Sequence, residues 1–251
     1  MKESIENEIV ELLKREQFAS VGDIAKELYV STATVRRKLT LLQKKQLITR
    51  KHGGAELNDM NNFSPSFSLR THTNSLEKKQ IALAAIKFIK NGDLIFIDGS
   101  TSCFFIADYL ADFNDIKVVT NGIDTLSLLS KYNIAAYSTG GIISDTNRST
   151  LVGQIAHNMI QTMHADIAFF SAQSVGKDGE IYDCYEQENY LRLAMMKNAS
   201  KKILLCDSSK LDKISSYHLC SMDEIDYVVS NADIYTYFGG KYAEKIIAVE
   251  K

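Results

Sequence analysis

The most informative part of this chain is residues 31–55, STATVRRKLTLLQKKQLITRKHGGA. It contains no acidic residue and seven basic ones: Arg36, Arg37, Lys38, Lys44, Lys45, Arg50 and Lys51. The whole chain has a formal net charge of −2 and a pI of about 6.2. No general excess of positive charge therefore attracts nucleic acid or an anionic membrane, and any polyanion must bind locally.

The residues around this stretch predict three short helices. Helical spacing of apolar side chains predicts a first helix that contains Ile5, Ile9, Leu12 and Leu13, and a second helix over residues 21–28. Ser31 can cap a third helix over residues 32–46. The buried face of that helix is expected to consist of Val35, Leu39 and Leu42.

A basic hairpin is predicted after the third helix. Residues 47–57, LITRKHGGAEL, have the pattern strand, turn, strand, and Gly53 and Gly54 are expected to supply the positive φ of a tight turn. A basic helix is most often only a solvated surface, but here helix-turn-helix spacing, a charge-segregated third helix and a basic hairpin occur together. This combination predicts a winged helix-turn-helix that binds the major groove of double-stranded DNA. The expected DNA-binding residues are Ser31, Thr32, Thr34, Arg36, Arg37, Lys38, Arg50, Lys51, His52, Gly53 and Gly54.

The rest of the chain has a different pattern. Residues 58–75 include the only proline and show no sustained apolar period, so we expect a linker between a DNA-binding unit at 1–57 and a larger unit at 76–251. In the larger unit, expected strands at 94–98, 117–121, 134–140, 165–172, 201–207 and 226–230 alternate with expected helices at 76–90, 102–111, 123–131, 151–163 and 186–199. Such alternation predicts an α/β fold with a parallel, doubly wound sheet.

Small polar residues follow four of the predicted strands. Glycine and hydroxyl residues at strand-to-helix junctions present backbone N–H groups to an anion, and ligands of open α/β sheets bind at the carboxyl ends of the strands. We therefore expect a polar ligand there, held by Asp98, Gly99, Ser100, Thr101, Ser102, Thr120, Asn121, Gly140, Gly141, Asp207 and Lys210. Glu188 is a further candidate, although its i, i+4 partner Arg192 equally allows a surface ion pair.

Several other classes of site are disfavoured by the motifs. The chain has no Walker A sequence, no G-x-G-x-x-G and no G-x-S-x-G, and its five histidines lack metal-ligand spacing, so we expect a small phosphorylated molecule and neither a metal nor another cofactor. The four cysteines are expected to be reduced core thiols. The sequence offers neither a signal peptide nor an apolar run of ~18 residues, which indicates a cytoplasmic protein without a membrane partner.

At this point the sequence resembles a known family. VGDIAKELYVSTATVRRKLTLLQKKQLITRKHGGA is similar to the winged helix-turn-helix of DeoR-type transcriptional repressors, and IDGSTS, VVTNG, STGG, GQIA, ADIAFFSA and LLCDSSK follow that family's order in its sugar-phosphate sensor domain. The resemblance implies a bacterial repressor of sugar-metabolism genes. It also implies a Rossmann-like, ribose-phosphate-isomerase-like sensor domain, release from operator DNA by a phosphorylated sugar, and a homodimer or homotetramer.

Two residues depart from the family pattern. Lys38 stands where the family usually has Asp, and Gln46 stands where it usually has Gly. We expect Lys38 to strengthen contacts with phosphate and to alter the choice of operator. Gln46 must end the third helix without the conformational freedom of glycine, which affects the angle of the wing.

The sequence leaves two other functions open. Asp98, Glu188, Asp207 and Lys210 are residue types that could catalyse proton transfer in a sugar-phosphate isomerase with a fused DNA-binding head. An activator, or a regulator without a ligand, would share the same head. The sequence does not identify the sugar, the operator or the regulated genes.

Overall fold

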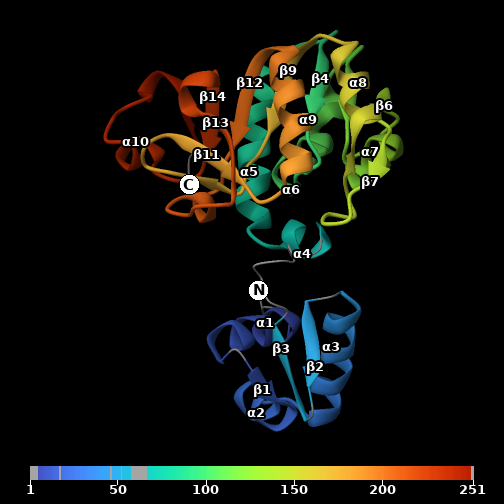
Figure 1. Cartoon of the computed structure of the whole chain (residues 1–251), viewed down its shortest axis with the longest axis vertical. Coiled ribbons are helices and arrows are strands. Elements are labelled where there is room, and N and C mark those ends of the chain that lie inside the picture. Colours follow the sequence, from blue (N-terminus) through green and yellow to red (C-terminus); the bar gives the residue numbers. More distant parts are fainter. Residues whose placement is uncertain (1–4, 17, 46, 52, 58–66, 250–251) are drawn as a thin grey trace. The chain divides into compact units, whose positions relative to one another are not determined.

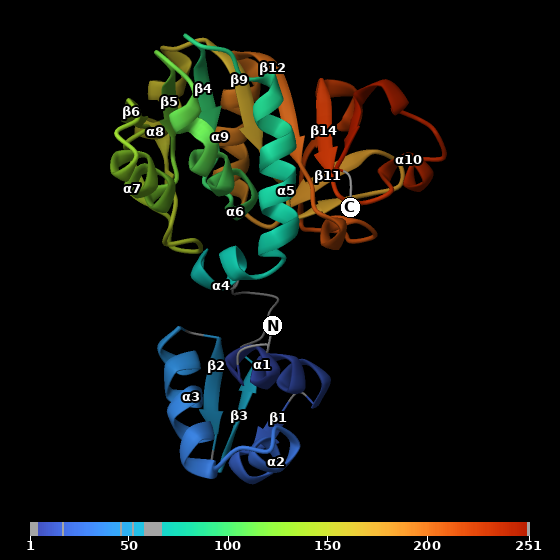
Figure 2. The same cartoon turned by 180° about the vertical axis from the view of Figure 1, so that it is seen from behind.

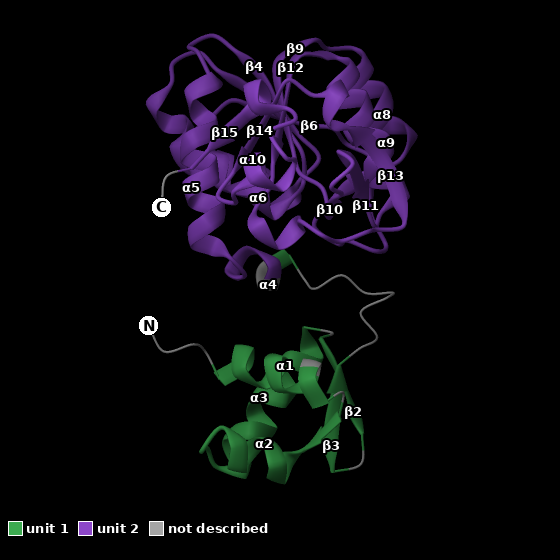
Figure 3. Cartoon of the chain, turned by 90° about the vertical axis from the view of Figure 1, so that its left-hand side faces the viewer, with its two compact units in different colours: residues 1–69 green, residues 70–251 purple. Residues whose placement is uncertain are grey.

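The computed structural model describes residues 5–16, 18–45, 47–51, 53–57 and 67–249. The chain divides into two compact units, residues 1–69 and 70–251, which are coloured separately in Figure 3. The division falls inside the segment 58–75. Within the described residues, no helix combines the length and the apolar character needed to cross a membrane.

The first unit contains three helices and a small antiparallel sheet. The helices are α1 (Ile5–Glu16), α2 (Val21–Glu27) and α3 (Thr32–Lys44). The sheet has the order β1–β3–β2 and consists of β1 (Phe18–Ser20), β2 (Ile48–Lys51) and β3 (Gly54–Leu57). The three helices and the hairpin were predicted, whereas β1 was not. A shared core includes Ile9, Leu13, Ile24, Leu39 and Leu42.

The start of α3 agrees with the prediction. Ser31 is its N-cap, and the Ser31 hydroxyl accepts a hydrogen bond of 3.2 Å from the backbone N–H of Thr34. Val35, Leu39 and Leu42 form the buried face of the helix. α3 ends at Lys44, earlier than the expected residue 46, and Gln46 itself lies outside the described residues.

The two glycines of the hairpin serve different purposes, which corrects the prediction that both supply a positive φ. Gly53 has a φ of +78°, as expected of a tight turn. Gly54 lies in β3, and only Gly53 of the pair has a positive φ. A Cβ on Gly54 would lie 2.4 Å from the backbone oxygen of Ala19, so glycine is needed there to let β1 approach.

The second unit is built on a seven-stranded parallel sheet. Its strands are β4 (Leu94–Ile97), β5 (Lys117–Thr120), β6 (Ala136–Ser138), β9 (Ala165–Phe170), β12 (Ala199–Leu205), β14 (Tyr227–Ser230) and β15 (Ile246–Ala248). The order across the sheet is β15–β14–β12–β9–β4–β5–β6. All six predicted strands are confirmed, and β15 is an additional edge strand.

Helices cover both faces of this sheet, so the predicted doubly wound α/β fold is confirmed (Figures 1 and 2). One face carries α5 (Ser75–Ala85), α6 (Thr101–Phe104), α7 (Ile123–Lys131) and the 3-10 helices η1 (Ile86–Phe88) and η2 (Phe105–Asp112). The other face carries α8 (Gln154–Gln161) and α9 (Glu186–Lys197). The side chains of β4 show this division, since Ile95 and Ile97 join the first core and Phe96 joins the second.

Several short elements were not predicted. In the segment 58–75, expected to be a linker, residues Phe67–His72 form helix α4. A second sheet, β10–β11–β13, consists of Ser174–Val175, Glu180–Asp183 and Tyr217–Ser221, and a two-stranded sheet pairs β7 (Ile142–Ile143) with β8 (Leu151–Val152). Strand β8 occupies the first residues of the helix expected at 151–163. The remaining elements are α10 (Ile234–Tyr237), η3 (Ser208–Lys210), η4 (Met222–Glu224) and η5 (Ala243–Lys245).

Candidate functional site

The N-terminal half of α3 presents the side chains expected to contact DNA. Ser31, Thr32, Arg36 and Arg37 are exposed, and the Thr34 hydroxyl lies 3.0 Å from that of Ser31. Within the described residues, neither Arg36 nor Arg37 forms an ion pair with a carboxylate. These two guanidinium groups therefore have free donors for phosphate or for the guanine edge.

Lys38 was expected to add a contact with DNA phosphate, but in the structure it pairs with a carboxylate of its own domain. Its ammonium group forms an ion pair of 2.9 Å with Glu6 of α1, and Lys45 forms one of 2.7 Å with the other oxygen of Glu6. Hydrogen bonds from Lys45 and Lys38 lower the pKa of Glu6. Lys38 thus joins α3 to α1, and we leave it out of the surface proposed to bind DNA.

Substitution of Glu6 tests this arrangement. Glu6→Gln is expected to destabilise the first unit by about 0.5–1 kcal/mol at neutral pH, because both ion pairs are partly exposed. Since the pKa of Glu6 is lowered from 4.5, its contribution is present above that pH and is lost as the pH falls through the folded-state value. Urea denaturation of both proteins at about pH 7 and about pH 3 checks this, and an equal difference at the two pH values would contradict it.

The hairpin carries the second set of expected DNA contacts. Arg50 is half-buried and Lys51 is exposed on β2, and the Lys51 ammonium lies 3.0 Å from a carboxylate oxygen of Glu56 on β3. His52 lies outside the described residues. The exposed ion pair of Lys51 contributes little stability, so a DNA phosphate can compete for it.

In the parallel sheet of the second unit, the carboxyl ends of the strands lie along one edge. The strand order reverses between β4 and β9. In open α/β sheets this reversal point opens a crevice between the loops that follow the two strands. Asp98 follows β4 and Ser171 follows β9. The backbone N–H of Ser171 donates to Asp98 Oδ2 at 3.3 Å, so the two loops are in direct contact.

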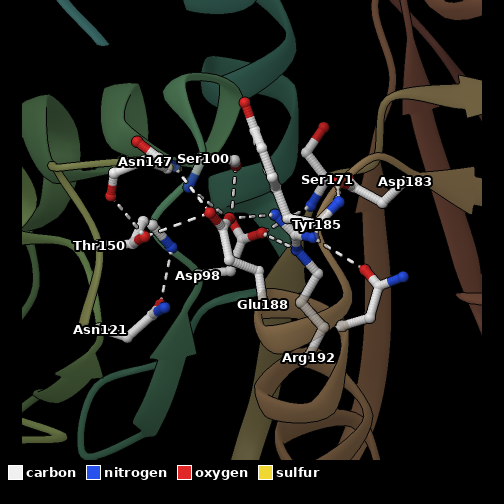
Figure 4. Close-up of polar contacts among 12 residues, drawn as sticks. Asp98, Ser100, Asn121, Asn147, Thr150, Ser171, Asp183, Tyr185, Glu188 and Arg192 are labelled. Carbon is white, nitrogen blue, oxygen red and sulfur yellow. Dashed lines mark hydrogen bonds and ion pairs between the residues drawn. The ribbon is translucent and has the colours of Figure 1, made fainter. Parts of the chain in front are cut away.

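A buried guanidinium group organises this end of the sheet (Figure 4). Arg192 of α9 is 5% exposed and forms ion pairs with three carboxylates. Its Nε lies 2.7 Å from Asp98, its Nη1 3.1 Å from Asp183, and its Nη2 3.0 Å from Glu188. Burial disfavours the charged form, but the three carboxylates raise the pKa of Arg192. We call Arg192, Asp98, Asp183 and Glu188 the buried ion-pair network.

This network excludes the alternative that Glu188 and Arg192 form a surface ion pair, and it shows how Asp98 is held. Glu188 is 3% exposed, so its pair with Arg192 is not a surface ion pair; burial raises the pKa of Glu188, although Arg192 opposes that effect. Asp98 is 1% exposed, and its two oxygens accept hydrogen bonds from Ser100, Ser171 and Arg192. Both carboxylates are therefore engaged by groups that hold the loops in place, and their expected contact with the ligand stays a prediction.

The loops after β4 and β5 are also joined to each other. Asn121 accepts a hydrogen bond of 2.8 Å from the backbone N–H of Gly99 and donates one of 3.1 Å to the carbonyl of Leu151. Thr120 accepts from the backbone N–H of Gly122 at 3.0 Å. A Cβ on Gly99 would lie 2.4 Å from Cγ2 of Thr150, just before β8, and 3.3 Å from the Cα of Gly122 in the loop after β5, so glycine lets the loop after β4 pack closely against both.

Two lysines lie close to the start of α6. Lys210 donates to the hydroxyls of Ser102 and Ser171, at 3.1 Å in the first case. Lys78 of α5 is 5% exposed and lies 3.3 Å from the Thr101 hydroxyl. Burial, together with the nearby charge of Lys210, lowers the pKa of Lys78 to about 8. We call Lys78, Lys210, Thr101 and Ser102 the cationic cluster.

The carboxylate of Asp207 faces this cluster from the loop after β12. Burial opposes the ionisation of Asp207, but Lys210 and hydrogen bonds from Ser209 together lower its pKa. Asp207 also accepts a hydrogen bond of 3.2 Å from Asn74. The charged groups that act on Lys78 are the cations Lys210 and Arg70 and the carboxylates of Asp207 and Glu77, so an added anion would interact favourably with the two lysines.

Gly140 and Gly141 are the two remaining glycines expected to bind the ligand. They follow β6 with φ values of +63° and +104°. A Cβ on Gly141 would lie 2.4 Å from the backbone oxygen of Val152 and 3.1 Å from the Cβ of Ala156. Close packing against β8 and α8 thus explains Gly141 without a ligand.

Comparison with known proteins assigns both units. Residues 6–61 match the DeoR-like helix-turn-helix domain and residues 73–232 match the DeoR C-terminal sensor domain. The chain belongs to the DeoR family of transcriptional regulators. The resemblance inferred from the sequence is therefore confirmed, and the first unit is the family's DNA-binding domain and the second its sensor domain.

Relatives in the DeoR family align over most of their length. GolR, a regulator from Listeria innocua, is 31% identical over 91% of this chain and 90% of its own. The L-fucose operon activator of Haemophilus influenzae is 29% identical over 90% of each chain, and the lactose phosphotransferase system repressor of Staphylococcus epidermidis is 28% identical over 90% of each. Solved structures of similar fold include ribose 5-phosphate isomerase from Plasmodium falciparum, which is 16% identical over 55% of this chain and 53% of that one, with a TM-score of 0.41.

Several residues of the sensor domain were missed by the sequence-based prediction. They are Lys78, Asn74, Asn147, Thr150, Ser171 and Asp183, together with the buried role of Arg192. Asn147 and Thr150 donate to Glu188 at 2.9 and 3.2 Å. Of these residues only Arg192 had a sequence signal, its i, i+4 spacing from Glu188.

Proposed function

We propose that this DeoR-family member is a repressor of sugar-metabolism genes and that a phosphorylated sugar releases it from operator DNA. The observation that carries the proposal is the cationic cluster at the carboxyl ends of the sheet, beside the point where strand order reverses. Two lysines and two hydroxyls at such a position suit a phosphate dianion, which accepts several charge-assisted hydrogen bonds.

The buried ion-pair network also supports a ligand site at the carboxyl ends of the strands. A ligand site needs a rigid frame, and Arg192 ties the loop after β4 to α9 and, through Asp183, to β11. Asn121 ties that loop to the one after β5. We propose that the sugar lies against these loops, with its phosphate at Lys210 and its hydroxyls near Ser100 and Asn121.

The DNA-binding side of the proposal rests on the exposed N-terminal half of α3. Ser31, Thr32 and Thr34 supply hydroxyls for phosphate, and Arg36 and Arg37 supply forked donors for phosphate or guanine. Arg50, Lys51, His52, Gly53 and Gly54 supply the wing. A homodimer or homotetramer would place two such helices on half-sites ~34 Å apart.

Release of DNA requires thermodynamic coupling between the two sites. A sugar phosphate weakens DNA binding only if it prefers a conformation that binds DNA poorly. The direction of control is the finer part of the proposal, since the relatives include the L-fucose operon activator as well as the lactose phosphotransferase system repressor. We propose repression, and a reporter fused to the regulated promoter distinguishes the two by the sign of the change on deletion.

An isomerase is the less favoured alternative. Proton transfer between carbons needs a carboxylate that is free to act as a base, whereas Asp98 and Glu188 are engaged by Arg192. Incubation of the purified chain with ribose 5-phosphate distinguishes the two functions. Catalytic conversion to a ketose phosphate would favour an enzyme, and stoichiometric binding without conversion favours a sensor.

Substitution of Lys210 tests the proposed phosphate contact. Lys210→Met is expected to weaken binding of the effective sugar phosphate at least about tenfold, because it removes one charge-assisted hydrogen bond. Lys213→Met is the matched control, since Lys213 is an exposed lysine of the same loop. Isothermal titration calorimetry measures both affinities, and equal affinity of the two variants would contradict the assignment of Lys210.

A further inference from the structure

Three residues at the start of the sensor domain connect the cationic cluster and the buried ion-pair network to the segment that leads toward the DNA-binding domain. They are Arg70 in α4, Asn74 directly before α5, and Lys78 in α5. All three lie in the second compact unit, and in the sequence they follow directly on the first. Each of them contacts a different loop at the carboxyl ends of the sheet.

Lys78 holds the end of α4. Its ammonium group donates to the backbone carbonyls of Arg70 and Thr73, at 2.5 and 2.9 Å, and to the Thr101 hydroxyl at 3.3 Å. Carbonyls at a helix C-terminus carry partial negative charge, so a buried ammonium group there stabilises the helix end. The same ammonium group therefore belongs both to the cationic cluster and to the support of α4.

Asn74 joins this segment to the loop after β12. It has a φ of +52° and is the N-cap of α5, but its side chain does not cap that helix. The Asn74 amide donates instead to Asp207 Oδ1 at 3.2 Å. Asp207 is also the carboxylate that faces Lys210, so the position of Lys210 and the position of Asn74 depend on one side chain.

Arg70 makes the third connection. Its Nη2 donates to Asn147 Oδ1 at 3.1 Å, and Asn147 Nδ2 donates to Glu188 at 2.9 Å. Glu188 in turn pairs with Arg192 of the buried ion-pair network. A change in the loop around Asn147 therefore reaches α4 directly.

We infer that Arg70, Asn74 and Lys78 are positioning residues that transmit occupancy of the ligand site to the segment entering the DNA-binding domain. The inference rests on the proposed function and specifies how that site acts on DNA. A phosphate dianion at the cationic cluster competes with the carbonyls of Arg70 and Thr73 for the ammonium group of Lys78, which loosens the contacts that fix α4. It also weakens the attraction between Lys210 and Asp207, the carboxylate that accepts the hydrogen bond from Asn74.

Asn74→Gly is the most direct test, because glycine adopts a positive φ freely and only the amide is lost. The measured quantity is the release factor, defined as the DNA dissociation constant at saturating sugar phosphate divided by that without it. The probes are ribose 5-phosphate, fructose 1-phosphate, fructose 6-phosphate and tagatose 6-phosphate, used with the full chain. Asn133→Gly is the control, since Asn133 is an exposed asparagine with a φ of +55° after α7.

We expect Asn74→Gly to weaken DNA binding in the absence of sugar toward the sugar-saturated wild-type value, and so to lower the release factor at least tenfold, without weakening affinity for the sugar phosphate. Asn133→Gly should leave all three quantities unchanged. Hydrogen exchange of the amides in residues 67–73 should be faster in Asn74→Gly, and in the wild type it should become faster on addition of the sugar phosphate.

Three results would overturn the inference. An unchanged release factor in Asn74→Gly would show that Asn74 transmits nothing, while the proposed function stands. A loss of sugar-phosphate affinity in proportion to the loss of release would make Asn74 a binding residue. If no probe releases the wild-type protein from DNA, the proposed function fails, and the inference fails with it.

Discussion

Replacement of Arg192 by methionine is expected to destabilise the sensor domain by about 3–5 kcal/mol, because it leaves buried carboxylates without their positive partner. Asp98, Asp183 and Glu188 all pair with this guanidinium, and Asp98 and Glu188 are almost fully buried. Methionine keeps much of the volume of the side chain, so loss of packing contributes less than loss of charge. Urea denaturation of the full chain, followed by near-ultraviolet circular dichroism, measures the change.

Two further variants keep this test informative. Arg148→Met is the matched control, since Arg148 is exposed and its ion pair among the described residues is the exposed one of 3.5 Å with Asp145. It should change stability by less than about 0.5 kcal/mol. Arg192→Met combined with Asp98→Asn should be less destabilised than Arg192→Met alone, because one unpaired charge is removed. If Arg192→Met were as stable as Arg148→Met, the network would not hold the domain together.

Simultaneous replacement of Arg36 and Arg37 by alanine is expected to weaken operator binding roughly 100-fold, or about 2–3 kcal/mol. Both side chains are exposed at the start of α3, and among the described residues neither pairs with a carboxylate. The dependence of binding on salt should also decrease, by about one or two in the slope of log K against log salt concentration. Fluorescence anisotropy with labelled operator DNA at several salt concentrations measures both quantities.

Arg15→Ala is the control for this experiment, and it removes one positive charge where the α3 variant removes two. Arg15 lies on α1 of the same domain and pairs with Glu16 at 2.8 Å and Glu27 at 3.0 Å. Its removal should change operator affinity by less than about threefold, because it lies outside the proposed DNA-binding surface. A free-energy loss for Arg15→Ala that is half that of the α3 variant or more would mean that only the net charge of the domain matters.

The elements that sequence patterns predicted best are those with a strong local signal. α3 has a cap at Ser31, an apolar face and a basic surface, and its start was predicted to the residue. The central parallel strands are continuous apolar runs because helices bury them on both faces. β1 has three residues, and β7, β8 and β10 have two each. Such short strands form only by pairing with other segments, which a local sequence pattern does not identify.

The ligand site was predicted less completely because its organisation depends on contacts between distant residues. Arg192 and Asp98 are separated by 94 positions, and Asn74 and Asp207 by 133. The same limit explains Lys38, whose partner Glu6 lies 32 positions earlier. Residue type and strand-end position predicted which residues follow the strands, but they did not identify which of these side chains hold the loops together through distant partners.

The most direct test of the account is anisotropy of the full chain on the DNA upstream of its own gene, titrated at fixed salt with a panel of sugar phosphates and the corresponding free sugars. The account predicts tight binding without ligand and release by one sugar phosphate but not by its unphosphorylated parent. Release by the free sugar as well would contradict the assignment of a phosphate to the cationic cluster. Binding that no sugar phosphate weakens would contradict the proposal that this regulator responds to one.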